Sequence, residues 1–215
     1  MKRMLIGTTL VAGALVAATV AAAAVIVGTP GDDVLRGTKQ ADRISAKAGN
    51  DVVYARGGGD DVRLGAGNDG LRAADGADLA YGGNGNDLVA GGDGPDRLYG
   101  GSDADQVNGG NGDDRGAGNR GADDVFGGDG GDSLFGGRGA DRVYGGSGND
   151  ELHALAADGD VDLLNCGPGN DKAWVLREER PRTQVVGCET IFVVVTVTPD
   201  QEEGENADAD AEADE

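Results

Sequence analysis

Aliphatic residues recur at every ninth position along most of the chain. With a frame set at Gly28, fourteen blocks of nine residues run to His153 without insertion or deletion. The eighth position is Leu, Ile or Val in twelve blocks, and Ala80 and Gly116 are the exceptions. Ile26 stands in the same register just before the first block. One apolar side chain per block predicts a very short strand at positions seven to nine, with the eighth side chain facing inward.

The polar positions of the block are as regular as the apolar ones. Glycine is the fourth residue in twelve blocks and the first residue in ten. Because glycine allows positive φ and close backbone approach, positions one to six predict a turn with inward-facing carbonyl groups. The departures from glycine are Gln40, Asp103, Ala46, Ala55, Leu64 and Ala73. The sixth position is aspartate in every block: Asp33, Asp42, Asp51, Asp60, Asp69, Asp78, Asp87, Asp96, Asp105, Asp114, Asp123, Asp132, Asp141 and Asp150.

This repeat predicts an all-β solenoid over residues 25–153. A three-residue strand cannot form a sheet within its own block, so it must stack on copies of itself. Two blocks, each a turn followed by a strand, close one coil of eighteen residues. Seven such coils would build two parallel sheets that face each other across the aliphatic eighth positions.

Composition and charge indicate what holds the coils together. The 215 residues include 42 glycines, and their formal net charge is −21. Lys and Arg are scattered singly, which excludes the clustered basic surface that a nucleic-acid partner requires. One buried aliphatic side chain per block contributes too little to offset the backbone entropy of ordering nine glycine-rich residues. Stacking also brings the aspartates into columns, about 4.8 Å apart, in which they would repel one another.

A divalent cation resolves both difficulties. Ca²⁺ accepts six to eight oxygen ligands and takes backbone carbonyls as readily as carboxylates. Mg²⁺ prefers a tighter octahedron with retained waters, and soft metals would need His or Cys, which the blocks lack apart from His153. Calcium is therefore the expected ligand of the fourteen aspartates.

Several blocks also resemble the repeat of a known family. The RTX, or haemolysin-type, calcium-binding nonapeptide G-G-x-G-x-D-x-U-x is matched most closely in residues 82–89, 91–98, 127–134, 136–143 and 145–152. The resemblance covers residues 28–153 and implies a right-handed parallel β-roll of about seven two-block coils. It also implies that each calcium ion lies between the loops of successive coils, held by the aspartate carboxylates and loop carbonyl groups.

The resemblance sets limits on the number and quality of the sites. Seven loops on each edge of the roll would hold at most about a dozen ions. The first blocks and the block at Gly100 depart from the repeat at Gln40, Ala46, Arg56 and Asp103, and we expect poorer sites there. The best sites are expected at Asp87, Asp96, Asp132, Asp141 and Asp150.

Residues 1–24 have the features of a secretory signal peptide. Lys2 and Arg3 precede a long apolar stretch, and an alanine run supplies small residues for cleavage after Ala23 or Ala24. An uncleaved membrane anchor is the alternative, because residues 5–27 are just long enough to span a bilayer. We expect cleavage, secretion and no stable membrane insertion afterwards.

After residue 153 the period breaks. Residues 166–171 restore one imperfect loop, displaced by three residues from the frame, and we expect residues 154–198 to form a β cap over the last coil. Within this cap, residues 174–176 and 191–197 are predicted strands. In an exported chain, Cys166 and Cys188 most simply form a disulfide, with free thiols as the alternative. Residues 199–215 contain nine acidic residues and no basic one, which predicts a disordered, solvated tail.

These observations favour an extracellular calcium-binding protein whose repeat region folds on binding Ca²⁺, and not an enzyme. The alternative is a calcium-stabilised surface scaffold or adhesion module whose ninth-position rings contact a partner or a polysaccharide. Rings that only cover neighbouring strands would explain the same pattern. These ninth-position aromatic residues are Tyr54, Tyr81, Tyr99, Phe126, Phe135 and Tyr144. Asp158, Asp160 and Asp162 begin like an EF-hand loop, but Leu163 and Gly169 replace its required glycine and glutamate.

Overall fold

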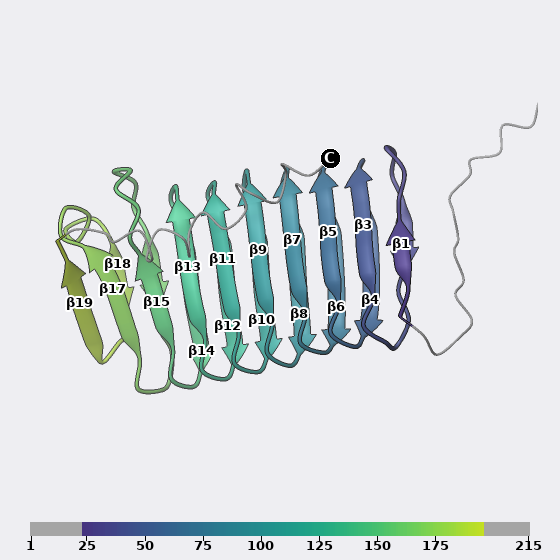
Figure 1. The fold of residues 1–215 in the computed structure, drawn as a ribbon. Helices are drawn as coiled ribbons and strands as arrows, with labels where there is room; N and C mark the ends of the chain where they lie inside the picture. The colour runs from purple at the N-terminus through teal and green to yellow at the C-terminus, as the bar shows by residue number, and fades with distance from the viewer. Residues whose placement is uncertain (1–22, 196–215) are drawn as a thin grey trace, which may run out of the picture.

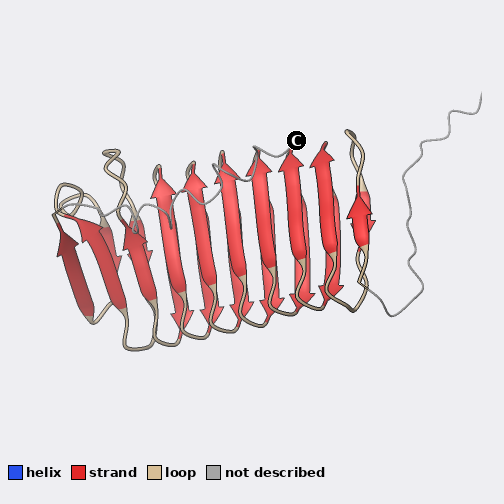
Figure 2. Cartoon of the chain, in the orientation of Figure 1, coloured by secondary structure: helices blue, strands red, loops and turns tan. Residues whose placement is uncertain are grey.

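The computed structural model describes residues 23–195, and all of their regular structure is β-strand (Figures 1 and 2). Two parallel sheets, of ten and nine strands, face each other along the whole length of the molecule. Each strand pairs with the strand two places away in the chain, so the backbone winds as a parallel β-solenoid of about nine turns. The expectation of an all-β solenoid is confirmed, with more turns than the seven predicted.

The strands alternate between the two sheets. The ten-stranded sheet contains β1 (Val25–Val27), β3 (Arg43–Ala48), β5 (Asp61–Ala66), β7 (Leu79–Asn84), β9 (Arg97–Ser102), β11 (Arg115–Arg120), β13 (Ser133–Arg138), β15 (Glu151–Ala154), β17 (Lys172–Leu176) and β19 (Thr190–Val194). The nine-stranded sheet contains β2 (Val34–Arg36), β4 (Val52–Gly57), β6 (Gly70–Asp75), β8 (Leu88–Asp93), β10 (Gln106–Asn111), β12 (Asp124–Asp129), β14 (Arg142–Ser147), β16 (Leu163–Asn165) and β18 (Gln184–Val186).

Two predicted segments are not covered by this description. Residues 1–22, which contain most of the predicted signal peptide, and residues 199–215, the predicted acidic tail, lie outside the described residues. No helix within residues 23–195 is long and apolar enough to cross a membrane.

Most strands are twice as long as the repeat predicts. They cover six residues, from position seven of one block to position three of the next, so the turn is reduced to positions four to six. The ladder skips position one, but the glycine at position two does not end the pairing. Gly83, for example, has a positive φ of 112° and still pairs with Gly65 and Gly101 in the neighbouring coils. The prediction of a six-residue turn was wrong because a glycine with positive φ can keep its place in the ladder.

The core is formed by two columns of inward-facing positions on each sheet. The eighth-position residues are buried as predicted, and Ile26 pairs with Ile44 at the start of the first sheet. Position one also faces inward, which the sequence analysis did not predict. Where this position is not glycine, its side chain joins the same core: Ala46, Ala55, Leu64 and Ala73 are all fully buried.

Within the segment predicted as a β cap, residues 163–194 form four further strands that continue both sheets. Strands β16 and β18 extend one sheet, β17 and β19 extend the other, and all four pair in parallel with the preceding coil. Ile191 and Val193 pair with the buried residues Ala173 and Val175, yet they are 38% and 46% exposed. Among the described residues, the last coil therefore leaves the end of the core open. The predicted disulfide between Cys166 and Cys188 is present and ties the segment after β16 to the start of β19.

Ninth-position rings stack on one another on the outer face of the ten-stranded sheet. The ring of His153 lies between those of Phe135 and Trp174, with centroid distances of 4.3 and 4.7 Å. The ring of Phe192 lies on the other side of Trp174, and the distance between these two centroids is 4.8 Å. Burial lowers the pKa of His153 to about 4, so this ring is neutral near pH 7. Because the ring faces contact one another, this geometry agrees with rings that cover neighbouring strands.

Candidate metal-binding turns

The turns bring all fourteen predicted aspartates into two columns. Each of these side chains is 1–4% exposed, because the sixth position precedes the strand and points inward with the eighth. The backbone N–H of each aspartate donates a hydrogen bond of 2.6–3.0 Å to Oδ1 of the acidic residue one coil later. One column runs through Asp33, Asp51, Asp69, Asp87, Asp105, Asp123, Asp141 and Asp162, and the other through Asp42, Asp60, Asp78, Asp96, Asp114, Asp132, Asp150 and Asp171.

The two columns contain two members that the nine-residue frame missed. Asp162 and Asp171 follow their predecessors by 21 residues instead of 18, because the chain inserts three residues after β15. The displaced loop at residues 166–171 was the signal for Asp171. Asp162 was considered only as part of an EF-hand loop, although it precedes Leu164 by two residues, as the sixth position precedes the eighth in each block.

The second carboxylate oxygen of most of these aspartates is buried without a hydrogen-bond partner. This holds for Oδ2 of Asp51, Asp60, Asp69, Asp78, Asp96, Asp114, Asp123, Asp132, Asp141, Asp150 and Asp171. Buried polar atoms are normally hydrogen-bonded, and an unpaired buried carboxylate is especially costly. Repeated orphan oxygens at the same position of successive turns indicate that a positive group belongs beside them.

The first two turns satisfy the same oxygen in a different way. The backbone N–H of Thr29 donates to Asp33 Oδ2 at 2.5 Å, and its hydroxyl lies 2.9 Å from the same atom. The N–H of Thr38 likewise donates to Asp42 Oδ2 at 2.5 Å. Threonine stands here at the second position, where eight of the twelve later blocks have glycine. These two turns therefore already hold their carboxylates through protein donors.

First-position glycines keep a space open beside the orphan oxygens. A Cβ atom added to Gly91 would overlap Asp96 Oδ2 and would lie 2.8 Å from the carbonyl oxygen of Gly109 in the next coil. A Cβ atom on Gly109 would meet Asp114 Oδ2 and the carbonyl oxygen of Gly127 in the same manner. A carboxylate oxygen and a carbonyl oxygen thus line one cradle that a side chain would fill.

Burial raises the pKa of many of the ladder carboxyl groups above 3.8, those of Asp60 and Asp123 among them. Desolvation is the largest cause, it is opposed by the hydrogen bond from the preceding aspartate's N–H, and neighbouring carboxylates raise the pKa further. The pKa of Asp96 and of Asp132 is raised to about 7, and that of Asp141 to about 8. In the absence of a cation, each such turn therefore favours a proton on its carboxyl group.

The ligand set of these turns is one of oxygen atoms, in which the backbone takes a large part. Within residues 23–195, no three Asp, Glu, His or Cys side chains converge closely enough to hold an ion by side chains alone. The oxygens available in a turn are the aspartate Oδ2 and the carbonyl groups around the first-position glycine. Such a mixture of carboxylate and carbonyl oxygen suits Ca²⁺, so the residues present fit the predicted cation.

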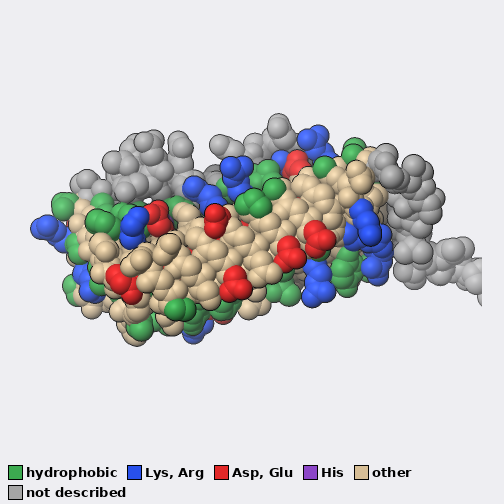
Figure 3. Space-filling view, turned by 90° about the horizontal axis from the view of Figure 1, so that it is seen from below, with side chains coloured by type: hydrophobic (Ala, Val, Ile, Leu, Met, Phe, Trp, Pro, Cys, Tyr) green, Lys and Arg blue, Asp and Glu red, His purple; other side chains and the backbone are tan. Residues whose placement is uncertain are grey.

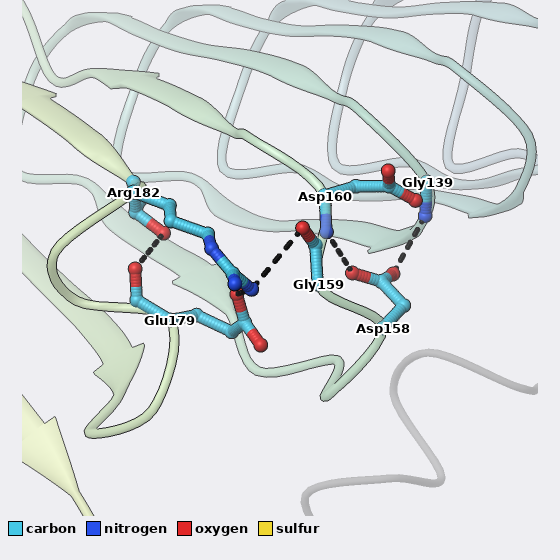
Figure 4. Close-up of polar contacts among 7 residues, drawn as sticks. Gly139, Asp158, Gly159, Asp160, Glu179 and Arg182 are labelled. Carbon is cyan, nitrogen blue, oxygen red and sulfur yellow. Dashed lines mark hydrogen bonds and ion pairs between the residues drawn. The ribbon is translucent and has the colours of Figure 1, made fainter.

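The acidic triplet after β15 does not form an EF-hand loop. Asp158 Oδ2 accepts a hydrogen bond of 2.8 Å from the N–H of Gly139, and Oδ1 accepts one of 3.0 Å from Asp160 N–H (Figure 4). The Arg182 guanidinium donates to the Gly159 carbonyl oxygen at 3.2 Å. These contacts fasten the inserted loop to the roll.

The edge of the roll is built from backbone and small polar side chains. Figure 3 looks onto the turns that follow the even-numbered strands, where acidic side chains are spaced along an otherwise mostly backbone surface. The asparagines of the opposite edge add a second ladder, in which Asn68 N–H donates to Asn50 Oδ1 at 2.8 Å and Asn86 N–H to Asn68 Oδ1 at 2.9 Å. Both edges are thus fixed by contacts that repeat once per coil.

Comparison with known proteins agrees with this geometry. The family model described as the RTX calcium-binding nonapeptide repeat matches residues 27–62, 37–71, 54–89, 81–116 and 117–152. Together these matches span residues 27–152, which is more than half of the chain and includes all fourteen predicted aspartates. No match to the chain is found among curated proteins.

Proposed function

Because the chain belongs to the family of RTX calcium-binding nonapeptide repeat proteins, we propose that it is an exported protein whose repeat region folds when its turns bind Ca²⁺. The observation that carries this proposal is the recurrence of a buried, unpartnered Oδ2 beside a glycine cradle in turn after turn. A fold that buries so many carboxylates is disfavoured until their charge is compensated.

Different oxygen atoms of each turn would bind the ion and join the coils. The aspartate Oδ1 receives the N–H of the preceding coil, whereas Oδ2 and the nearby carbonyl groups remain for the cation. Bound Ca²⁺ would supply a divalent charge shared by oxygen atoms of adjacent coils. Since each ladder bond also needs the next coil in place, ion binding and coil stacking are coupled.

The coupling of ion binding to coil stacking would make folding depend on whether the chain is inside or outside the cell. Extracellular calcium modules have dissociation constants of about 10⁻⁴–10⁻³ M, which keeps such sites empty at low cytosolic calcium and fills them outside the cell. The amino-terminal segment with its basic start and alanine run supports secretion. We therefore propose that the roll stays open before export and closes afterwards.

Far-ultraviolet circular dichroism of the purified chain tests the proposal. In EGTA we expect a spectrum with much less β-structure than in calcium, and addition of millimolar Ca²⁺ should produce the full β spectrum, whereas Mg²⁺ at the same concentration should have a much smaller effect. Identical spectra in EGTA and in calcium would refute calcium-dependent folding.

We place calcium-dependent folding before the role of a scaffold or adhesion module. The ring faces that an adhesion surface would use are stacked against each other, as in the pairs Tyr81–Tyr99 and Phe126–Tyr144, both at 5.0 Å. We also propose no catalytic role, and His153 is enclosed in the ring stack between Phe135 and Trp174.

A further inference from the structure

The roll has two segments that differ in how their interior is filled. In β3–β6, both inward positions carry apolar side chains, so four strands supply eight of them: Ile44, Ala46, Val53, Ala55, Val62, Leu64, Leu71 and Ala73, each at most 3% exposed. In β7–β14, position one is always glycine, and eight strands supply only seven inward side chains: Ala80, Val89, Leu98, Val107, Val125, Leu134 and Val143. The first segment buries about twice as much apolar material per strand.

The glycine cradles have the opposite distribution. They occur at every first position of β7–β14: Gly82, Gly91, Gly100, Gly109, Gly118, Gly127, Gly136 and Gly145. A Cβ atom at any of these would lie within about 3 Å of Oδ2 of the aspartate five residues later. In β3–β6 the same place is taken by a real side chain, and in the two turns before β3 threonines already satisfy the carboxylate.

The orphan oxygen alone does not separate the segments. Oδ2 of Asp51, Asp60, Asp69 and Asp78 lacks a partner as well. What differs is its neighbour: a methyl or isobutyl group in β3–β6, and the open cradle lined by a carbonyl oxygen in most of the later turns. Only the later turns combine a buried free oxygen, such as those of Asp96, Asp114 and Asp123, with a first-position glycine that lets this oxygen and a carbonyl oxygen approach each other without a side chain between them.

We propose that β3–β6 form a metal-independent nucleus and that calcium binds only in the turns that follow β7–β14. The inference rests on the proposed calcium binding and assigns the ions to the turns of Asp87, Asp96, Asp105, Asp114, Asp123, Asp132, Asp141 and Asp150. The nucleus offers a preformed coil on which β7 and β8 can stack, so the calcium-dependent coils add to an existing template. Helix-free solenoids fold by such nearest-neighbour propagation, because each repeat contacts only adjacent repeats.

Hydrogen–deuterium exchange of the full-length chain, followed by mass spectrometry of peptides, tests this division. In EGTA, amides of residues 43–75 should exchange at least about 100-fold more slowly than those of residues 79–147. Calcium should then protect residues 79–147 while changing residues 43–75 much less. Equal, fast exchange of both segments in EGTA with protection of both by calcium would overturn the nucleus but leave the proposed function intact.

Two other outcomes concern the proposed function directly. If calcium protects no peptide while residues 43–75 stay protected in EGTA, calcium-dependent folding fails and the apolar nucleus stands. If residues 79–147 are already protected in EGTA, both proposals are overturned, because the later coils would then cohere without metal.

A matched pair of variants tests the assignment of the ions. Gly109 does not have a positive φ, so Gly109→Ala causes no backbone dihedral strain, and its Cβ atom would meet the two oxygens of the cradle, Asp114 Oδ2 and the carbonyl oxygen of Gly127. It should lower the number of bound ions, counted by equilibrium dialysis with ⁴⁵Ca²⁺, by at least one and leave the protection of residues 43–75 in EGTA unchanged. Ala55→Gly should do the reverse: it should speed exchange of residues 43–75 in EGTA with no loss of bound ions. If Ala55→Gly loses ions, or Gly109→Ala binds the full number, the assignment is wrong.

Asp114→Asn tests the same site independently, in case Gly109→Ala does not fold. The amide keeps the oxygen that accepts from Asp96 N–H at 2.8 Å but removes the charge beside the cradle. This variant should lose at least one ion as well, again with the nucleus protected in EGTA. Full ion binding by Asp114→Asn would contradict the site assignment even if Gly109→Ala did not fold.

Discussion

Neighbouring aspartates in this chain have very different roles, as Asp123 and Asp124 show. Asp123 is 1% exposed, accepts the N–H of Asp105 at Oδ1, and has an unpartnered Oδ2. Asp124 points outward from β12 and forms an ion pair of 3.2 Å with Arg142, in which the Asp124 and Arg142 side chains are 37% and 62% exposed. Position within the block, and not residue type, therefore decides which carboxylate belongs to a site.

This contrast gives a direct prediction. Asp123→Asn should weaken calcium binding at least about tenfold, because it removes the charge beside the cradle while keeping the ladder bond. Asp124→Asn is the matched control and should leave affinity nearly unchanged, since exposed ion pairs contribute about 0–1 kcal/mol. Isothermal titration with Ca²⁺ measures both, and equal effects of the two substitutions would argue against Asp123 as a ligand.

The raised pKa values predict how pH acts on the calcium-free protein. The pKa of Asp60, Asp96 and Asp132 is raised to about 7 in the folded chain, against 3.8 as the ordinary value. The folded state therefore binds more protons than the unfolded state between about pH 4 and pH 8, and stability falls as pH rises through this window. Circular dichroism in EGTA should show β-structure near pH 4.5 that is lost towards pH 8.

With saturating calcium the dependence should reverse. Protons then compete with the ion for the same carboxylates, so acidification should release calcium and lower the thermal midpoint. A calcium-free protein that gains structure as pH rises would contradict the burial of these carboxyl groups.

At the level of single strands, Leu64 marks where the interior differs most from the repeat. It lies in β5 and is the first residue of its block, a position at which ten of the fourteen blocks have glycine. Its side chain is fully buried in the main core. Leu64→Ala should lower the free energy of unfolding by roughly 2–5 kcal/mol, as large-to-small core substitutions do. Leu88→Ala is the control, because Leu88, the seventh residue of its block and the first of β8, is 48% exposed. The effect of this substitution on the free energy of unfolding should stay within about 0.5 kcal/mol. Urea unfolding in calcium buffer measures the difference, and a loss from Leu64→Ala no larger than that from Leu88→Ala would contradict its place in the core.

The strands also show what the sequence could predict and what it could not. The sixth and eighth positions were predictable, because a fixed period of nine places an Asp at the sixth position of every block and Leu, Ile or Val at the eighth position of twelve blocks. The inward direction of position one was not, since glycine there has no side chain to reveal which way it faces. The signal lay in the four first positions that are not glycine, but these residues were read only as departures from the repeat: Ala46, Ala55, Leu64 and Ala73. The strand length was missed because glycine was assigned to turns, although Gly83 pairs on both sides.

At the scale of the whole molecule, the last coils depend on a covalent link. The disulfide joins residues 22 positions apart and encloses β17 and β18. Such a link contributes about 3 kcal/mol by restricting the unfolded chain. Reduction, or the double change Cys166→Ala and Cys188→Ala, should therefore loosen β16–β19 without affecting the earlier turns.

Limited proteolysis with mass spectrometry checks this outcome. In calcium, cleavage after reduction should appear within residues 163–194, while residues 43–147 of the same sample serve as the internal control and stay intact. Cleavage spread evenly over the chain would show instead that the disulfide supports the whole roll.

The overall architecture was predictable to the extent that the period held. Fourteen blocks without a gap indicated coils of eighteen residues, and the structure has them. The last two turns were missed because the three-residue insertion after β15 breaks the period, while the pairing of β17 with β15 restores the same stacking 21 residues apart. Parallel stacking tolerates an insertion that stays in one turn, whereas a search for a fixed period does not.

Because the contacts between coils repeat once per coil, the solenoid can gain or lose whole coils without changing the contacts of the others. Between β3 and β14, the aspartate and asparagine ladder bonds and the strand register join residues eighteen apart, and the other backbone bonds between coils recur at constant offsets of seventeen or nineteen residues. Excising residues 82–99 would therefore join Tyr81 to Gly100 and give each remaining residue a neighbour of the same kind. Excising nine residues would instead transfer everything downstream to the opposite sheet. Natural or engineered changes can therefore shorten or lengthen this protein in steps of one full coil.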